Sequence, residues 1–364
     1  MAQKIYTFDE IKARIIGRGS KSSKIEWLKN EAGFNETDAE ATYRLVIMAN
    51  PRPAPTRRQR REVREAAFEL MHFTVGVELE CTNVDRGRVR RICSERGIAT
   101  HDDYNNYNHR DSRDSYKLMS DGSLRRSRGD SYGTCEIVTP ILNDLASLKT
   151  VCEILNEAGA KVNKSCGLHV HFGASTFTDA QWRRIICNYG RIEAIIDGFM
   201  PASRRGDGCG WCHTITDHAR VIERMPSPTF SQMRSVVAYG DASGARYHKV
   251  NLEAFARHHT IEFRQHAGTI DFAKIENWVK FLAGLLTYSI KNEALLEART
   301  LNDLPFLTAE QKAFFKGRSN RFAERENREA VYAEAETVYN RPSRCGGYSQ
   351  READLAGAFA GLPM

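Results

Sequence analysis

The stretch Phe73-Thr-Val-Gly-Val-Glu-Leu-Glu80 alternates apolar and acidic side chains along its second half. Successive side chains of a β-strand point to opposite faces, so Val77 and Leu79 share one face and Glu78 and Glu80 share the other. One such segment is typical of a half-exposed surface strand. The same alternation recurs in Gly133-Thr-Cys-Glu-Ile-Val-Thr139, Gly167-Leu-His-Val-His-Phe-Gly173 and Thr260-Ile-Glu-Phe-Arg264. Together the four segments indicate a sheet whose concave face is a metal site.

The bulk composition is that of a globular protein that binds anionic ligands. The 364 residues suffice for one large domain with appendages or for two domains. No run of about 18 apolar residues is present, and the first ten residues lack a signal-peptide core, so we expect a cytoplasmic protein without membrane contact. Nine cysteines, an odd number, are expected to be free thiols in a reducing compartment. The net charge of +7 fits nucleotides and permits nucleic acid.

Three regions are predicted along the chain. Residues 1–56 form a small helical region, with helices at 8–16, 24–31 and 36–48, that ends in a proline-rich linker. Residues 57–300 form the catalytic domain, and residues 301–364 a helical C-terminal extension with a helix at 308–339. Within the catalytic domain, helices are expected at 143–159, 178–199 and 272–298. Strands are expected at 73–81, 115–119, 133–139, 166–173, 246–254 and 259–266.

Four further segments fall largely outside the predicted helices and strands or allow a functional interpretation. Segment 85–132 is polar and predicted to be a mobile loop over the site, and segment 201–245 is predicted to be largely irregular. The basic run at 57–64 is interpreted as a solvated helix face, with a nucleic-acid contact as the alternative. Cys209-Gly-Trp-Cys212 is interpreted as a loop with two free thiols. A zinc half-site is the alternative there, although no second cysteine pair follows.

Four glutamates occupy strand-like apolar segments, namely Glu78, Glu80, Glu136 and Glu262. A strand interior disfavours glutamate unless its face is wet or coordinated. Solvent exposure on an open sheet explains one such residue easily, but it explains four of them less well. Carboxylates are the ligands that Mg²⁺ prefers, often together with water and nucleotide phosphates. The four glutamates therefore favour a magnesium site.

Histidine and basic residues accompany these glutamates. His169 and His171, at i and i+2, reach a common point and suit zinc alone or Mg²⁺ or Mn²⁺ together with carboxylates. Arg264 lies beside Glu262 and can bind a phosphate through two of its donors. Further candidate ligands for phosphate or carboxylate lie on a strand-like stretch: Arg246, Lys249 and Asn251. The turn Asp121-Gly-Ser123 is a secondary candidate for substrate contact.

Taken in order, these pieces resemble the putative amidoligase family of glutamine synthetase-like and glutamate–cysteine ligase-like carboxylate–amine ligases. The resemblance covers residues 73–290. It rests on Gly76-Val-Glu-Leu-Glu80, Asp121-Gly-Ser123, Glu136-Ile-Val-Thr-Pro140, Cys166-Gly-Leu-His-Val-His-Phe-Gly173, the stretch 246–251, and Thr260-Ile-Glu-Phe-Arg264 followed by Gly268-Thr269.

The resemblance implies an α+β fold: a curved antiparallel sheet of glutamine synthetase-like type, with helices on its outer face and the active site on its inner face. It also implies an ATP-dependent ligase. ATP phosphorylates a carboxylate, an amine attacks the acyl phosphate to form an amide, and two or more Mg²⁺ ions, or Mn²⁺, neutralise the phosphates. The substrates implied are small-molecule or peptide carboxylates and amines. Related ligases often assemble and are often found in phage, so the resemblance points to a bacterial or phage protein and leaves a homo-oligomer open.

The roles implied by the resemblance are assigned by motif. Glu78, His169 and Glu262 hold one metal ion, and Glu80 and Glu136 hold the other. His171 contacts ATP phosphate, as do Arg246, Lys249 and Asn251 in a looser motif. Arg264 stabilises the transferring phosphoryl group, so catalytic roles fall to Arg264, Glu262 and Glu136.

Two other classes of function stay open. The first is a metal-dependent hydrolase that uses His169 and His171 around zinc or manganese, without ATP. The second is a nucleic-acid-binding protein with an inactive ligase-like core, which has support only from the basic run at 57–64. Four carboxylates against two histidines favour the harder metal ion and thus the ligase.

Overall fold

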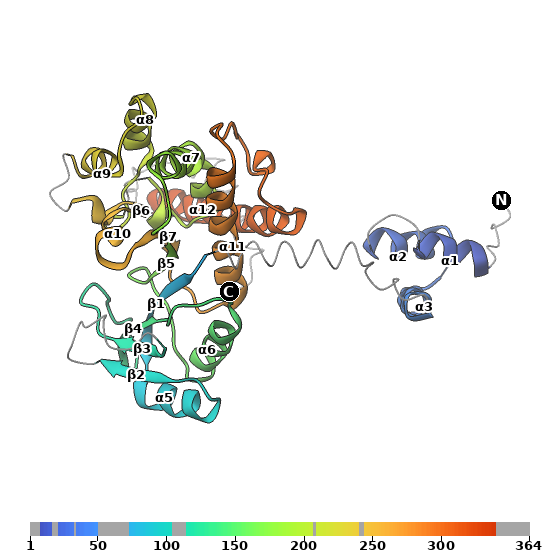
Figure 1. Cartoon of the computed structure of the whole chain (residues 1–364). Coiled ribbons are helices and arrows are strands. Elements are labelled where there is room, and N and C mark those ends of the chain that lie inside the picture. Colours follow the sequence, from blue (N-terminus) through green and yellow to red (C-terminus); the bar gives the residue numbers. More distant parts are fainter. Residues whose placement is uncertain are drawn as a thin grey trace, which may run out of the picture. The chain divides into compact units, whose positions relative to one another are not determined.

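The computed structural model describes residues 8–16, 21–32, 34–49, 73–103, 114–206, 209–239 and 244–339 (Figure 1). The chain divides into two compact units, Met1–Ala66 and Ala67–Met364. The predicted linker at 50–56 and the basic run at 57–64 lie outside the described residues. The finer division at residues 56 and 300 stays a prediction.

The N-terminal unit contains the three predicted helices: α1 (Phe8–Ile16), α2 (Lys21–Asn30) and α3 (Glu36–Ala49). Asn35 immediately precedes α3 and caps it: its side-chain oxygen accepts a hydrogen bond from the backbone N–H of Asp38 at 2.9 Å. Apolar side chains from all three helices form a small core of their own: Ile11, Ile15, Leu28, Ala39 and Val46.

The second unit is built on a seven-stranded sheet with the strand order β2-β3-β4-β1-β5-β7-β6. Every neighbouring pair is antiparallel except β2 and β3. The strands are β1 (Val75–Val84), β2 (Thr100–Asp103), β3 (Tyr116–Met119), β4 (Gly133–Val138), β5 (Gly167–Gly173), β6 (Val250–Asn251) and β7 (Thr260–Ala267). The four alternating segments of the sequence are thus four adjacent central strands, and the mixed α+β class is confirmed.

Helices cover the apolar face of this sheet. α7 (Asp179–Asp197) begins with a capping box between Thr178 and Gln181 and packs against α11 (Phe272–Lys291). Both helices share one hydrophobic core with the inward-facing strand residues Val77, Leu79, Leu168, Val170 and Phe263. The opposite face is left to the acidic and imidazole side chains, as the alternation predicts.

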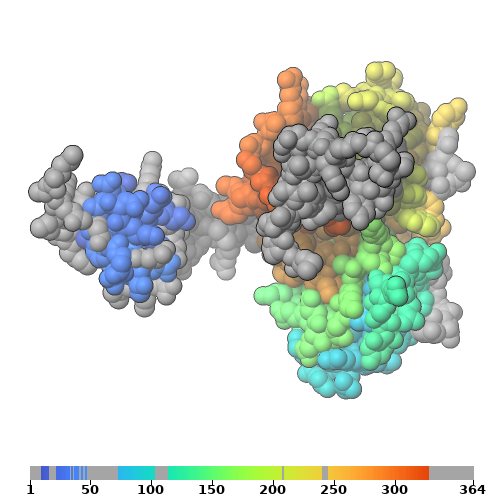
Figure 2. Space-filling model, turned by 180° about the vertical axis from the view of Figure 1, so that it is seen from behind, coloured from blue at the N-terminus to red at the C-terminus, as the bar shows by residue number. Residues whose placement is uncertain are grey.

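The remaining helices gather at the two ends of this unit (Figures 1 and 2). α5 (Arg86–Glu95) and α6 (Ala146–Glu157) lie with β2–β4 at one end. α8 (Thr216–Arg224), α9 (Phe230–Ala238) and α10 (Glu253–His258) lie at the other end. α12 (Ala309–Tyr339) is the predicted C-terminal helix. Short 3₁₀ turns occur at Ala202–Arg204 (η1), Gly244–Tyr247 (η2) and Leu301–Asp303 (η3).

Four secondary-structure predictions are wrong. Segment 246–254 is not one strand: it is η2, the two-residue β6 and the start of α10, because Asn251 accepts the Glu253 N–H at 2.8 Å and turns the chain into a helix. Segment 85–132 contains α5, which Asp85 caps through the Arg88 N–H at 3.0 Å, and β2, neither of which was predicted, as well as β3, the strand predicted at 115–119. Segment 201–245 contains α8 and α9, and the predicted helix 272–298 ends at Lys291.

A β-bulge in β7 changes which side chains face the helices. Val170 pairs with Phe263 and Leu168 pairs with His266, so β7 has one residue more than β5 in this interval. The extra residue shifts the alternation, and the buried His266 ring lies 5.6 Å from the ring of Trp278 in α11. Arg264, before the shift, keeps the pocket side.

The helices are too short or too polar to cross a bilayer. Of those within the described ranges, none combines the length and the apolar composition that a membrane span needs.

Candidate functional site

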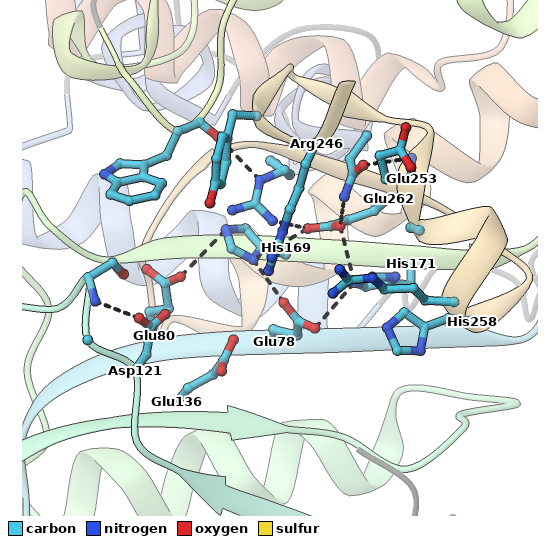
Figure 3. Close-up of a pocket in the computed structure, with 18 of the residues that line it drawn as sticks. Glu78, Glu80, Asp121, Glu136, His169, His171, Arg246, Glu253, His258 and Glu262 are labelled. Atoms are coloured by element: carbon cyan, nitrogen blue, oxygen red, sulfur yellow. Dashed lines mark hydrogen bonds and ion pairs between the residues drawn. The ribbon is translucent and has the colours of Figure 1, made fainter. Parts of the chain in front are cut away.

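A pocket of ≈ 330 Å³ lies on the polar face of the sheet. β1, β4, β5 and β7 supply its floor, and the turn after β3, η2 and α10 supply its walls. Figure 3 shows the convergence of its acidic and imidazole side chains, which include Glu78, Glu80, Asp121, Glu136, His169, His171 and Glu262. The structure therefore brings together every metal ligand that the sequence predicts.

One group of carboxylates comes from β1, β4 and the turn after β3. Glu80 and Glu136 are direct partners across the β1–β4 pair, and Asp121 joins them with ligand atoms within 4.8 Å of one another. Glu80 accepts a hydrogen bond from the Gly167 N–H at 2.5 Å, and Asp121 accepts one from the Ser123 N–H at 2.6 Å. Asp121, a secondary candidate in the sequence, thus belongs to the centre of the site.

A second group comes from β1, β5 and β7. Glu262 pairs with His171 across β5 and β7, and Glu78 lies on the neighbouring strand β1. His171 Nε2 lies 3.3 Å from Glu78 Oε1 and 3.9 Å from Glu262 Oε2. The three side chains form a second set with ligand atoms within 4.8 Å of one another. The geometry therefore places His171 beside the ligands that the resemblance assigns to one metal ion.

His169 lies between the two groups. Its Nδ1 is 2.9 Å from Glu78 Oε2 and 3.6 Å from Glu262 Oε1, and its Nε2 is 3.6 Å from Glu80 Oε1. It also forms a three-residue set with Glu78 and Glu136. One imidazole thus connects the two carboxylate groups into a single cluster.

The electrostatics of the cluster are uneven. Burial raises the pKa of Glu136 well above its usual value, and the charges of Glu78, Glu80 and Asp121 raise it further. Burial also opposes ionisation of Glu78 and Glu262, but nearby cations outweigh it and lower both pKa values, chiefly His171 for Glu78 and Arg264 for Glu262. The cationic side chains therefore balance the negative charge of Glu78 and Glu262, but they do not balance the negative charge around Glu136.

The donor set fits a divalent cation. Glu136 Oε2 is buried and has no hydrogen-bond partner in the described part of the chain, an arrangement that costs free energy unless a further group satisfies it. A set of carboxylate oxygens with one or two imidazoles suits Mg²⁺ or Mn²⁺ better than it suits zinc, which favours sulfur and imidazole ligands. Glu80, Asp121 and Glu136 provide such oxygen donors in one place.

The basic side chains differ in their placement. Arg264 Nη1 contacts Glu262 Oε1 at 2.5 Å, and its Nε donates to the Trp211 carbonyl at 3.2 Å. Arg246 also lines the pocket, with its guanidinium 5.7 Å from the ring centre of Tyr247. Asn251 donates to Glu262 Oε2 at 2.5 Å and so orients this carboxylate.

Lys249 is the predicted site residue that the pocket does not contain. Its side chain is fully buried behind the sheet, where Nζ donates to Glu193 Oε1 at 2.5 Å and Asp197 Oδ1 at 2.9 Å, both on α7. The predicted strand alternation would place Lys249 with Asn251. β6 begins only at Val250, so that alternation does not extend back to Lys249.

Comparison with known families gives an independent result. The family model described as a putative amidoligase enzyme matches residues 72–286, more than half of the chain, including all seven strands. The chain belongs to this family. The family predicted from the sequence motifs is thereby confirmed. No curated protein matches the chain.

The sequence analysis of this amidoligase family member missed several pocket residues. They come from two segments, 201–245 and 246–258, whose helical elements were not predicted: Arg204, Trp211, Tyr247, Glu253, Arg257 and His258. Glu253 and Arg257 are four residues apart, a spacing that places them on one face once α10 is recognised as a helix. Arg204 and Trp211 carry no periodic signal, because they lie in η1 and in a loop.

We expect Gly167→Ala to damage the site of this family member. A Cβ at this position would lie 2.9 Å from His169 Nε2 and 3.3 Å from Glu80 Oε2. Both side chains must then shift, and we expect divalent-metal affinity to fall about 10- to 100-fold. Isothermal titration with Mn²⁺ measures the change, with Gly122→Ala as control because no atom lies within 4 Å of a Cβ there. Equal affinities for the two variants would contradict this close packing around Gly167.

Proposed function

We propose that this family member is an ATP-dependent carboxylate–amine ligase that forms an amide bond through an acyl phosphate. The observation that carries the proposal is that one pocket holds two clusters of carboxylates, connected by His169, beside Arg264 and Arg246. The family assignment supports a ligase-type activity. ATP dependence and the acyl-phosphate step go beyond that assignment and rest on the chemistry of the pocket.

Charge is the main physical support. A pocket lined by Glu78, Glu80, Asp121, Glu136 and Glu262 repels the phosphates of ATP unless cations stand between them. Divalent ions reverse this repulsion, since they bind carboxylates on one side and phosphate oxygens on the other. An acidic pocket that also contains arginines is therefore suited to a metal–nucleotide complex.

The position of each residue in the pocket suggests its role. Glu80, Asp121 and Glu136 would hold one ion, and Glu78 and Glu262 would hold another together with His169, with His171 adjacent. When bound, these ions supply neutralisation of phosphate charge. Arg264 is held by Glu262 and the Trp211 carbonyl, and its remaining N–H groups are available to stabilise a transferring phosphoryl group. Arg246 would bind an outer phosphate or a substrate carboxylate.

We extend the proposal to the type of sheet. The antiparallel order β4-β1-β5-β7, with helices on one face and the acidic pocket on the other, supports a curved sheet of the glutamine synthetase-like kind. In such a sheet the strand curvature brings side chains from four strands to one point, as required for a site assembled from β1, β4, β5 and β7.

The first test is ATP turnover by the full chain with and without Mg²⁺, in the presence of panels of carboxylic acids and amines. We expect Mg²⁺-dependent release of ADP and phosphate when an accepted pair is present, and an amide product by mass spectrometry. With ¹⁸O in the substrate carboxylate, an acyl-phosphate route transfers one ¹⁸O atom to the released phosphate. Hydroxylamine as amine should give a hydroxamate.

The other outcomes separate the competing functions. Amide or ester hydrolysis that needs Mn²⁺ or Zn²⁺ but not ATP would establish the hydrolase hypothesis. Salt-dependent nucleic-acid binding without any nucleotide affinity would favour the binding protein. Absence of ATP binding with each divalent metal tested would refute the ligase.

A further inference from the structure

A cysteine pair flanks Trp211, one of the residues that line the pocket. Cys209 and Cys212 enclose a tight turn in which the Cys212 N–H donates to the Cys209 carbonyl at 3.1 Å. Cys209 is partly exposed, whereas Cys212 is completely buried. One accessible thiol is thus followed, three residues later, by a protected one.

Cys209 differs from the other cysteines that the structure describes in this unit, because its pKa is lowered and theirs are raised. A hydrogen bond with the Cys212 side chain lowers the pKa of Cys209 to about 5, against the opposing effect of partial burial, with help from the Arg204 charge. Cys81 and Cys135 face each other across β1 and β4, and burial raises the pKa of both thiols. The low pKa of Cys209 favours its thiolate form at neutral pH, whereas burial favours the protonated thiols of Cys81 and Cys135.

We propose that Cys209 and Cys212 are a redox-active dithiol that low-molecular-weight disulfides of the glutathione type oxidise reversibly. The Cys209 thiolate attacks one sulfur of the disulfide, forms a mixed disulfide and releases one thiolate. The Cys212 thiol then attacks the Cys209 sulfur, and its proton passes to the second small thiolate, which leaves as a thiol. The protein dithiol loses two electrons and the small disulfide gains them.

The turn is connected to the pocket through its backbone. Trp211, between the two cysteines, accepts the hydrogen bond from Arg264 Nε at 3.2 Å. The next residue after the pair, His213, donates its N–H to the Tyr247 carbonyl at 2.7 Å and accepts from the Lys249 N–H at 2.9 Å. A covalent Cys209–Cys212 bond constrains this turn. Oxidation of the pair therefore alters the position of the Trp211 carbonyl and, through it, the position of the Arg264 guanidinium.

Zinc binding is the competing explanation for two cysteines at this spacing. Within the ranges that the structure describes, three sets of metal-type side chains are close enough to share an ion, and neither cysteine belongs to any of them. A structural zinc site needs four ligands, so the observed geometry favours the dithiol.

The test uses the full chain and does not depend on ligase activity. The reduced protein is incubated in glutathione buffers of increasing oxidation, quenched with acid, alkylated and digested. We expect a peptide linking Cys209 and Cys212 that has lost two hydrogen atoms and is restored by dithiothreitol, while Cys81 and Cys135 stay alkylatable after unfolding. In the reduced protein, iodoacetamide at about pH 6 should modify Cys209 at least about tenfold faster than any other cysteine.

Two variants complete the test. Cys212→Ser should stop at the mixed disulfide of Cys209 with glutathione, and Cys209→Ser should form neither product. Hydrogen exchange of the Trp211 and His213 amides should differ between the oxidised and the reduced protein. The proposal is overturned if no Cys209–Cys212 disulfide forms in the most oxidising buffer, or if the purified protein contains stoichiometric zinc that Cys209→Ser removes.

Discussion

The Glu136→Gln variant is expected to lose roughly 10²- to 10³-fold in Mg²⁺-dependent ATP turnover and yet to be more stable than the wild type without metal. The two effects have one cause. Glu136 is buried among Glu78, Glu80 and Asp121, and one of its oxygens has no hydrogen-bond partner among the described residues. A neutral amide of the same shape removes the repulsion and also removes a ligand for a cation.

The pH dependence follows from the direction of the Glu136 pKa. Because this pKa is raised in the folded state, the stabilising contribution of the group is complete below the unfolded-state pKa and is lost as pH rises through the folded-state pKa. Without metal, the free energy of unfolding of Glu136→Gln should exceed that of the wild type by about 1–3 kcal/mol near pH 7. The gain should shrink at acidic pH, where the wild-type carboxyl is protonated.

Urea unfolding with and without Mg²⁺ measures both effects. Mg²⁺ should stabilise the wild type by mass action and should stabilise Glu136→Gln much less. Glu276→Gln, on the surface of α11 and paired with Lys280 at 2.7 Å, is the matched control and should change neither quantity. A Glu136→Gln protein that is less stable than the wild type without metal would show that the carboxylate is satisfied in the fold.

The second large effect is expected for Lys249→Met. Lys249 Nζ is fully buried and balances Glu193 and Asp197 of α7. Asp197 also accepts from Gln265 at 2.5 Å, and Gln265 accepts from Tyr189, so removal of the ammonium affects a connected network. We expect a loss of about 3–5 kcal/mol in the free energy of unfolding, because the buried Glu193 and the partly buried Asp197 lose their counter-charge.

The prediction distinguishes a structural lysine from a phosphate ligand. Folded Lys249→Met at low temperature should retain the wild-type KM for ATP within about twofold, since Nζ points away from the pocket. Lys280→Met, which removes a partly exposed lysine paired with Glu276, is the control and should cost less than about 1 kcal/mol. A large rise in KM with unchanged stability would place the ammonium on the pocket side instead.

Sequence patterns predict the centre of this protein well because its central strands are regular. Period-two alternation in β1, β4, β5 and β7 needs no tertiary information to place Glu78, Glu80, His169, His171 and Glu262 on one face. The pattern becomes unreliable where the backbone departs from a regular strand. Before β6 the alternation fails for Lys249, and after the β7 bulge it fails for His266.

The network around Lys249 shows which contacts a sequence pattern can predict and which it cannot. Tyr189, Glu193 and Asp197 follow one another at i, i+4 and i+8, so a helix places them on one face. Glu193 lies among the buried, mostly apolar positions of this helix, which signals a buried counter-charge. Nothing in the sequence identifies Lys249, which is 56 residues from Glu193, as that charge.

The sequence by itself determined the four central strands, the face that carries their acidic side chains and the family to which the chain belongs, because these depend on local periodicity and on short motifs. The tertiary structure alone decided that Asp121 joins Glu80 and Glu136, that His169 connects the two carboxylate groups, and that Lys249 lies behind the sheet. It also placed the Cys209–Cys212 turn against Arg264 through Trp211. Strand order, bulges and loop closure set these contacts between residues far apart in the chain, and no local pattern encodes them.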